Sequence, residues 1–223
     1  MESVHASEVT TRVGRIPLLV SDPPESTALV VLGPGAGAGM EHPFMGHVAA
    51  GLADRRLAVA RFDFPYMAAG RRAPDKQPVL EAAYRDVVEH LRPVAGGRRL
   101  VLGGKSMGGR IASHIAAAGT SCDGLVFLGY PLHPPGKPEK LRSAHLESIT
   151  TPMLFVEGTR DPFCPLATLE EVRAGLSAPT SVAIIDDGDH SFKVRKSSGR
   201  TSQQAWDEVV THVATWVEVP PGG

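Results

Sequence analysis

The sequence has few cysteines, no long apolar run and no signal-peptide pattern. Its two cysteines, Cys122 and Cys164, are too few and too unpatterned for a disulfide framework or a zinc site, which fits a reducing compartment. No stretch approaches the roughly 18 consecutive apolar residues that a membrane span requires. The first residues, MESVHASEVT, lack a basic region followed by an apolar one. We therefore expect a cytoplasmic protein with no membrane partner.

The sequence also lacks an excess of either charge. Lysine and arginine total 23, aspartate and glutamate total 24, and the formal net charge is -1 at pH 7. Such a balance offers no basic surface for nucleic acid, so the expected partner is a small molecule. A chain of 223 residues can bury one good core, and we expect one domain that acts as a monomer or homodimer.

Short apolar runs alternate with amphipathic segments along most of the chain. Nearly continuous apolarity is typical of strands that are covered on both faces. Strands are predicted at 28–33, 57–64, 99–104, 124–130, 152–158 and 181–186, and helices at 42–55, 78–92, 107–118, 167–176 and 202–217. The alternation predicts an α/β fold, doubly wound, with a mostly parallel sheet of about six to eight strands and helices on both faces. Ligands bind such sheets at the carboxyl ends of the strands.

The predicted boundaries follow from the remaining segments. Residues 11–22 are expected to form an antiparallel edge strand. A single domain is predicted over residues 11–218, with residues 1–10 as a flexible tail and residues 219–223 frayed. The insertion PLHPPGKPEK, residues 131–140, is too short and too rich in proline for a cap domain.

The segment GKSMG, residues 104–108, fits two different motifs: the end of a phosphate-binding loop and the whole of a serine-hydrolase motif. A phosphate-binding loop needs G-x-x-x-x-G-K-[ST], but the five residues before Gly104 begin at Arg99 and form the predicted strand itself. The other motif is the G-x-S-x-G of a serine hydrolase, in which a sharp turn between strand and helix exposes the serine hydroxyl. The flanking glycines avoid collisions with the neighbouring strand and helix. Ser106 is therefore the predicted nucleophile, with the backbone N–H of Met107 beside the reacting oxygen.

A serine nucleophile needs a base and a group that orients the base. In hydrolases with this turn, the acid follows the serine and the histidine comes last. Asp161 in EGTRDPF and His190 in DDGDHSF each come just after a predicted strand, so their loops can converge on Ser106. Asp187 remains an alternative acid, whereas Asp189 adjoins the histidine and cannot easily turn back onto its ring.

The glycine-rich segment GPGAGAGM follows the first predicted parallel strand. A turn at this place supplies the second donor of an oxyanion hole, and we expect that donor to be the N–H of Ala36, between Gly35 and Gly37. The segment also fits the G-x-G-x-x-[GA] of a dinucleotide fold, with Asp63 at the end of the next strand. Against this alternative, the next helix is predicted to begin near His42, several residues after the last glycine.

Ser106, Asp161 and His190, together with GPGAGAG, resemble the α/β-hydrolase superfamily, and more narrowly its small cap-less members akin to dienelactone hydrolase. The resemblance covers about residues 11–218. The phrases RFDFPYMAAGRRAPD, GYPLHPPGKPEKLR and EGTRDPF resemble one branch of bacterial hydrolases, whose eukaryotic relatives include a subunit of a chromatin-modifying complex. The resemblance implies an α/β-hydrolase fold without a cap domain.

Two positions depart from the family's pattern. Many members have a histidine before the oxyanion glycine, where this chain has Pro34. The residue before the nucleophile is often apolar or acidic, but here it is Lys105, which favours an anionic substrate unless its side chain points into solvent. We expect the substrate to contact residues near the nucleophile and residues that follow predicted strands, namely Gly35, Gly37, Lys105, Phe64, Tyr66, Tyr130 and His133.

These residues predict a serine hydrolase that cleaves a small ester-like substrate, a carboxylester, thioester or lactone, through an acyl-enzyme on Ser106. His190 takes the serine proton, Asp161 orients the imidazole, and the N–H groups of Met107 and Ala36 bind the oxyanion. This mechanism implies no cofactor and no metal. A non-catalytic interaction scaffold with the same fold, and a peptidase with the same triad, remain alternatives.

Overall fold

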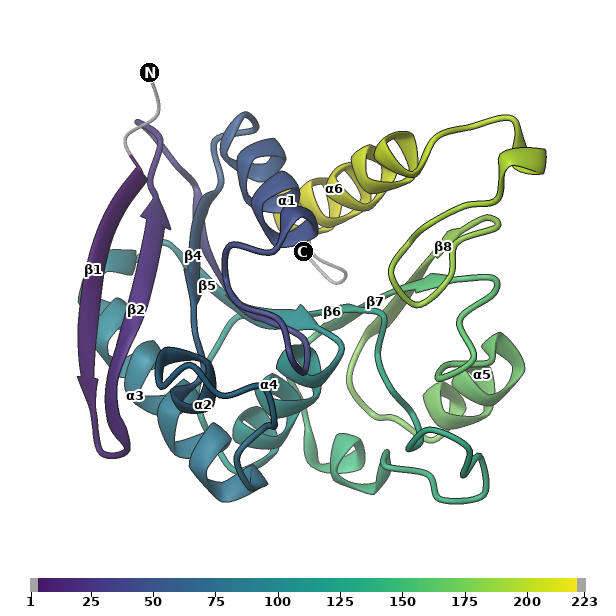
Figure 1. Ribbon diagram of the computed structural model, residues 1–223, viewed down its shortest axis with the longest axis horizontal. Coiled ribbons are helices and arrows are strands. Elements are labelled where there is room, and N and C mark those ends of the chain that lie inside the picture. The colour runs from purple at the N-terminus through teal and green to yellow at the C-terminus, as the bar shows by residue number, and fades with distance from the viewer. Residues whose placement is uncertain (1–3, 220–223) are drawn as a thin grey trace.

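The computed structural model describes residues 4–219, which form an eight-stranded sheet between two layers of helices (Figure 1). The strand order is β1-β2-β4-β3-β5-β6-β7-β8. Pairing is antiparallel between β1 and β2 and between β2 and β4, and parallel elsewhere. The strands are β1 (Val4–Thr11), β2 (Gly14–Ser21), β3 (Ala28–Gly33), β4 (Ala58–Phe62), β5 (Arg99–Lys105), β6 (Gly124–Leu128), β7 (Met153–Gly158) and β8 (Thr180–Ile185).

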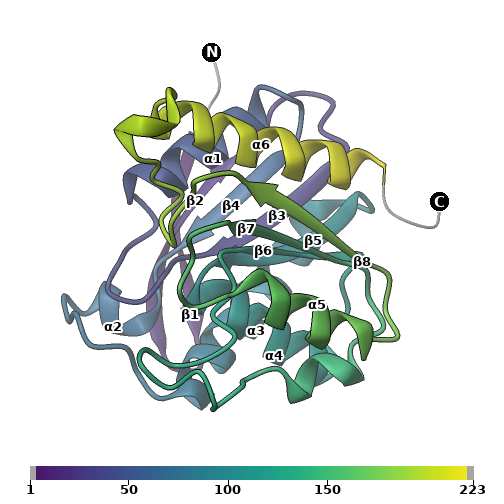
Figure 2. The same ribbon diagram turned by 90° about the vertical axis from the view of Figure 1, so that its right-hand side faces the viewer.

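Helices cover both faces of the sheet (Figure 2). One face carries α1 and α6, and the other carries α2, α3, α4 and α5. The helices are α1 (Pro43–Ala53), α2 (Pro65–Ala68), α3 (Gln77–Ala95), α4 (Met107–Ala117), α5 (Leu166–Ala174) and α6 (Ser202–Glu218), with short 3-10 turns at Ala144–Ser148 and Lys196–Ser198. None of the helices in the described part of the chain combines the length and apolarity needed to cross a membrane.

The central strands are apolar on both faces because each face packs against a helical layer. Leu29 and Val31 of β3 belong to the core under α3 and α4, whereas Val30 and Leu32 belong to the core under α1 and α6. Successive side chains of a strand point to opposite faces, so a central strand needs an uninterrupted apolar run. The predicted fold class is thereby confirmed, and each predicted strand and helix from residue 28 onward is present, with ends that differ by about three residues at most.

The prediction for the N-terminus is wrong. Residues 4–10, expected to lie in a flexible tail, form most of β1, which runs antiparallel to β2 from Val4 opposite Ser21 to Thr11 opposite Gly14. The strand gives little signal in the sequence because only Val9 of its side chains is buried. The strand predicted at the edge, β2, therefore lies one position further in. Residues 1–3 and 220–223 lie outside the described residues, so the remainder of both predicted tails stays a prediction.

The insertion at 131–140 forms a loop after β6 and does not build a cap domain in the described chain. The loops that follow β3, β5, β6, β7 and β8 therefore shape the carboxyl edge of the sheet themselves. This edge carries the residues predicted to act on the substrate.

Candidate active site

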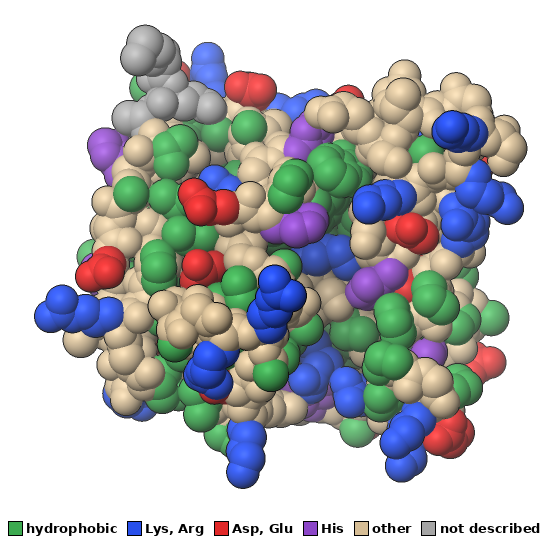
Figure 3. Space-filling view, viewed as in Figure 1, with side chains coloured by type: hydrophobic (Ala, Val, Ile, Leu, Met, Phe, Trp, Pro, Cys, Tyr) green, Lys and Arg blue, Asp and Glu red, His purple; other side chains and the backbone are tan. Residues whose placement is uncertain are grey.

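The loops at the carboxyl edge surround a cavity of about 700 Å³. The space-filling view shows a hollow near the middle of one face, with lysine and arginine side chains inside it (Figure 3). Ser106 and His190 both line this cavity, as do Gly35, Lys105 and His133 among the residues predicted to contact substrate.

Ser106 occupies a strained turn between β5 and α4. Its backbone has a φ of 51° and a ψ of -112°, which residues with a Cβ rarely adopt. The turn packs tightly on β3: a Cβ on Gly104 would lie 2.2 Å from the carbonyl oxygen of Gly33, and one on Gly108 would lie 2.0 Å from it. Both glycines of the motif therefore allow the close packing that the sequence predicted. The turn places the serine hydroxyl at the wall of the cavity.

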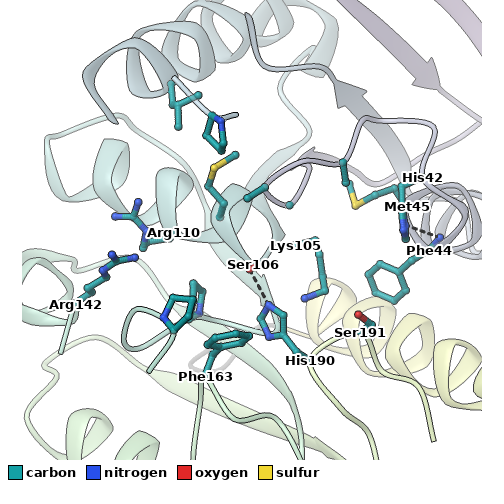
Figure 4. Close-up of a pocket in the computed structure, with 18 of the residues that line it drawn as sticks. His42, Phe44, Met45, Lys105, Ser106, Arg110, Arg142, Phe163, His190 and Ser191 are labelled. Carbon is teal, nitrogen blue, oxygen red and sulfur yellow. Dashed lines mark hydrogen bonds between the residues drawn. The ribbon is translucent and has the colours of Figure 1, made fainter. Parts of the chain in front are cut away.

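A histidine links this hydroxyl to a buried carboxylate. Nε2 of His190 lies 2.8 Å from Oγ of Ser106 (Figure 4), and Nδ1 lies 2.6 Å from Oδ2 of Asp161. Because a carboxylate only accepts, we assign the imidazole proton to Nδ1, which leaves Nε2 free to accept the serine proton. The other oxygen of Asp161 accepts the N–H of Phe163 at 2.8 Å. The Phe163 ring packs edge-on against the imidazole, with centroids 4.6 Å apart.

The acid and the histidine meet because the ends of β7 and β8 lie in close contact. A Cβ on Gly158 would lie 2.2 Å from the carbonyl oxygen of Gly188. That same oxygen accepts the N–H of Arg160 at 2.9 Å. The loops carrying Asp161 and His190 therefore start side by side, and the parallel register of the two strands brings both residues to the same edge.

Asp187 and Asp189, the other two aspartates considered as the orienting acid, bind groups other than the imidazole. Asp187 binds Arg195 through the backbone N–H at 2.7 Å and through Nε at 2.6 Å, and it lies 3.6 Å from Arg160. The hydrogen bonds from Arg195 hold the pKa of this carboxyl below its usual range. Asp189 accepts the N–H of Ser191 at 2.8 Å and so stabilises its own turn. Of the three carboxylates considered from the sequence, only Asp161 contacts the imidazole.

The two predicted oxyanion donors face the same cavity. Ala36 and Met107 both line it, and in the part of the chain that the structure describes neither backbone N–H donates to a protein acceptor. A hydrogen bond stabilises the loop that carries Ala36, because the N–H of Gly37 donates to the buried Tyr66 hydroxyl at 3.1 Å. Asp63, considered above as a ribose ligand, instead accepts the N–H of Met40 in this loop at 2.7 Å.

A second serine–histidine contact lies on α4. Oγ of Ser113 lies 2.8 Å from Nε2 of His145 and 3.0 Å from the hydroxyl of Tyr130. Ser113 is fully buried, and burial together with the neighbouring His114 lowers the pKa of His145 to about 4. No carboxylate among residues 4–219 accepts from His145, so this cluster lacks the third member of a triad.

A family model described as the alpha/beta hydrolase domain matches residues 26–218. The chain belongs to the α/β-hydrolase superfamily. Among solved structures, a dienelactone hydrolase from Anabaena variabilis superposes with a TM-score of 0.78 over 97% of both chains at 18% identity. An α/β serine hydrolase without a lid from Xanthomonas campestris gives 0.73 over 98% of this chain and 97% of its own at 19% identity. The esterase domain of a Rhodothermus marinus protein gives 0.72 over 96% and 97% at 14% identity.

Three of the aromatic residues predicted to contact substrate do not line the hydrolase's cavity. Phe64, Tyr66 and Tyr130 are fully buried. The chain turns into α2 directly after Phe64, and this turn directs the rings of Phe64 and Tyr66 into the core under α3. Tyr66 still contributes indirectly, through its hydrogen bond to the oxyanion loop. Gly37 also lies outside the cavity lining, whereas His133 lines it as predicted.

The amine of Lys105 in this hydrolase is buried near Asp161 and does not point into solvent. Its Nζ has no hydrogen-bond partner among the described residues and lies 5.6 Å from the centre of the Phe192 ring. Burial lowers the pKa of this amine to about 8, although nearby Asp161 and Glu157 oppose the shift. Glu157 is itself fully buried on β7, and burial raises its pKa well above the usual value. The carboxyl of Glu157 is therefore stabilised in its protonated form.

Several cavity residues of the hydrolase were not predicted from the sequence. Arg110 lies one helical turn beyond Ser106, and Phe163 lies two residues beyond Asp161, so the spacing from the motifs could have indicated both. Phe44 and Trp206 come from α1 and α6, which carry no catalytic motif. Within residues 4–219, no three His, Cys, Asp or Glu side chains gather as metal ligands.

Proposed function

We propose that this hydrolase cleaves ester-like substrates through an acyl-enzyme formed on Ser106. The observation that carries the proposal is the pair of hydrogen bonds that joins Ser106 to His190 at 2.8 Å and His190 to Asp161 at 2.6 Å. His190 accepts the serine proton as the oxygen attacks the substrate carbonyl, and Asp161 stabilises the imidazolium that forms. The strained backbone of the nucleophile supports the same role.

The tetrahedral oxyanion is bound by the N–H groups of Met107 and Ala36. Met107 is the first residue of α4, so the positive end of the helix dipole adds to its effect. The carbon–oxygen bond to the leaving group then breaks, and His190 gives its proton to the departing alcohol. Water repeats the sequence, with His190 as base, which releases the acid and restores the Ser106 hydroxyl. This mechanism requires neither a metal nor a cofactor.

The substrate class that fits best is a small carboxylester, thioester or lactone. The cavity is bounded by short loops and no cap domain in the described chain, so it suits a substrate that is small or partly exposed. Two of the similar structures are a dienelactone hydrolase and an esterase domain, which is consistent with this class.

A fluorophosphonate probe followed by intact-mass measurement tests the nucleophile. We expect one adduct on the wild-type protein and on Ser113→Ala, which removes a buried serine that also contacts a histidine. We expect none on Ser106→Ala. Labelling that survives Ser106→Ala would exclude the assignment.

Turnover of short-chain p-nitrophenyl esters separates an enzyme from an interaction scaffold with the same fold. Catalysis predicts turnover that is lost in Ser106→Ala, whereas a scaffold predicts none that depends on Ser106. A parallel assay with p-nitroanilide peptides distinguishes an esterase from a peptidase that uses the same three side chains.

A further inference from the structure

Two arginine side chains lie together at one end of the cavity without an acidic partner. Arg110 comes from the first turn of α4 and Arg142 from the loop after β6, and both line the cavity wall (Figure 4). In the described chain neither guanidinium forms an ion pair. Arginines elsewhere do so, as with Arg12 and Asp86 at 2.6 Å.

The contacts of Arg110 are all to neutral or like-charged groups. Its guanidinium donates to Oε1 of Gln77 at 3.0 Å and lies 3.1 Å from Nε2 of His114. Glu81, a carboxylate whose charge acts on Arg110, already binds Arg85 at 3.0 Å. Burial and the like charge of Arg142 both lower the pKa of Arg110. A partly buried guanidinium opposite a second cation is unfavourable until an anion lies between them.

Two lysines add positive charge to the cavity wall. Lys105 and Lys193 line it, and the amine of Lys105 is buried without a hydrogen-bond partner among the described residues. Asp75 contributes the one carboxylate in the lining, and it binds Arg71 at 2.7 Å. The whole chain has a formal charge of -1, whereas the cavity lining carries four Lys or Arg side chains and one carboxylate, and Figure 3 shows lysine and arginine side chains inside the hollow. Such a concentration attracts anionic substrates.

The opposite end of the cavity is apolar. Phe44, Met45 and Trp206 line it, and the Phe44 ring packs against Trp206 with centroids 5.4 Å apart. The close-up shows Ser106 and His190 between this end and the two arginines (Figure 4). A substrate whose reacting carbonyl lies at Ser106 therefore reaches a cationic wall in one direction and an aromatic wall in the other.

We propose that the cavity binds esters that carry a carboxylate at one end and an apolar group at the other. The carboxylate is held by Arg110 and Arg142, whose planar guanidinium groups match a carboxylate with two parallel hydrogen bonds. The apolar group packs against Phe44 and Trp206. Half-esters of dicarboxylic acids are the simplest members of this class. This inference rests on the proposed function of Ser106.

Matched pairs of esters test the preference. The first pair is p-nitrophenyl hydrogen adipate and p-nitrophenyl ethyl adipate, which place a carboxylate or a neutral ester on the acyl side. The second pair is 4-carboxyphenyl hexanoate and its methyl ester, which vary the charge on the leaving group. We expect kcat/KM for the carboxylate member of at least one pair to exceed that of its neutral twin about tenfold, and the ratio to fall as salt is raised. Ser106-dependent turnover with no carboxylate preference in either pair would overturn the inference.

Substitutions of the arginines test whether Arg110 and Arg142 cause the preference for a carboxylate. Arg142 lies on an exposed loop, so Arg142→Gln should fold normally and reduce the carboxylate preference about tenfold. Arg142→Glu should reverse it in favour of the neutral ester. Arg15→Gln, an exposed position on β2 outside the cavity, is the matched control and should leave the ratio unchanged. A preference that persists in both Arg142→Gln and Arg110→Gln would contradict the assignment.

A binding measurement separates this inference from the proposed catalysis. Ser106→Ala is titrated with monoethyl adipate in a calorimeter, which requires no turnover. We expect saturable binding that weakens about tenfold when Arg142→Gln is added. Binding without turnover of any ester by the wild type would support the carboxylate site and refute the acyl-enzyme. Absence of saturable binding would refute the site whether or not esters are cleaved.

Discussion

Two aspartates lie near the histidine, and their other contacts determine which one orients it. Asp161 is buried and directs one oxygen to the imidazole, whereas Asp187 binds Arg195 and Arg160. We predict that Asp161→Asn lowers kcat by about 10³- to 10⁴-fold, because the amide no longer holds the correct tautomer. KM for a neutral p-nitrophenyl ester should change little, since Asp161 lies behind the histidine and does not line the cavity.

The matched control is Asp187→Asn. It removes the partner of Arg195, so the melting temperature should fall while kcat stays within a few-fold of wild type. Equal losses of kcat in both variants would mean that Asp161 is not the orienting acid.

Lys105 offers a second prediction at the scale of one residue. Its pKa is about 8 in the folded protein and 10.5 for the free side chain, so the folded state below pH 8 carries a buried ammonium at a cost. We predict that Lys105→Met raises the free energy of unfolding at pH 7 by about 2 kcal/mol. The gain should shrink between pH 8 and pH 10, where the wild-type amine loses its proton. Urea unfolding of the wild type and the variant at pH 7 and at pH 10 measures the change in the free energy of unfolding. A less stable variant at pH 7 would show that attraction to Asp161 outweighs the cost of burial.

The sequence predicted which side chains meet at Ser106 better than it predicted which residues line the cavity, for a physical reason. Ser106, Asp161 and His190 each follow a parallel strand, and parallel strands deliver such residues to one edge. Phe64 and Tyr66 also follow a strand, but the helical turn after Phe64 directs their rings inward. Which side of a loop a ring occupies depends on the local backbone path, which no spacing of residues reveals.

At the scale of elements, the contact between α4 and β3 sets the shape of the nucleophile turn. A Cβ on Gly108 would lie 2.0 Å from the carbonyl oxygen of Gly33, and this backbone atom cannot move without displacing the strand. We predict that Gly108→Ala lowers the free energy of unfolding by about 3 kcal/mol or more, as expected for severe overpacking. Gly46→Ala is the control, because Gly46 is also helical and the nearest atom to its new Cβ lies at 3.7 Å. That variant should be neutral or stabilised by up to about 1 kcal/mol.

A buried hydroxyl helps to hold the loop that carries Ala36. Tyr66 accepts the N–H of Gly37 at 3.1 Å, next to the proposed donor Ala36. Tyr66→Phe should keep the packing of the ring but loosen the loop, so we predict a fall in kcat of about fivefold to tenfold. Tyr84→Phe removes another buried hydroxyl, which binds the carbonyl oxygens of Val31 and Gly103 inside the core. This control should lower stability with a smaller effect on kcat, and the opposite ranking of the two variants would contradict the role of Tyr66.

Helices and strands were predictable from the sequence where their burial requires a regular pattern of apolar residues. The strands from β3 to β7 are buried along their whole length or nearly so, and each appeared as an apolar run. β1 contributes one buried side chain, Val9, and is held by its backbone ladder to β2. Backbone pairing is independent of side-chain identity, so an edge strand of this kind leaves no apolar period to detect.

At the scale of the whole molecule, stability and chemistry occupy different parts of the sheet. The antiparallel strands β1 and β2 form one edge, and the cavity draws its residues from the loops around the carboxyl ends of β3, β5, β6, β7 and β8 and from the helices beside them. Solved structures with less than a fifth of their residues identical share this fold. The fold therefore tolerates wide substitution, and the function depends on the residues of the site and not on the fold.

Removal of the first 12 residues tests that separation. The truncated chain loses β1 and the ion pair between Arg12 and Asp86, but no residue that lines the cavity. We predict that kcat/KM stays within about twofold of the full chain, whereas the free energy of unfolding falls by about 2 to 4 kcal/mol through the loss of the buried Val9 and the strand ladder. The exposed edge of β2 should also promote association, although Pro17 removes one of its donors. Esterase kinetics, urea unfolding and light scattering measure the three effects. A large loss of kcat/KM in a truncated chain that remains folded and monomeric would show that the edge strand supports the site after all.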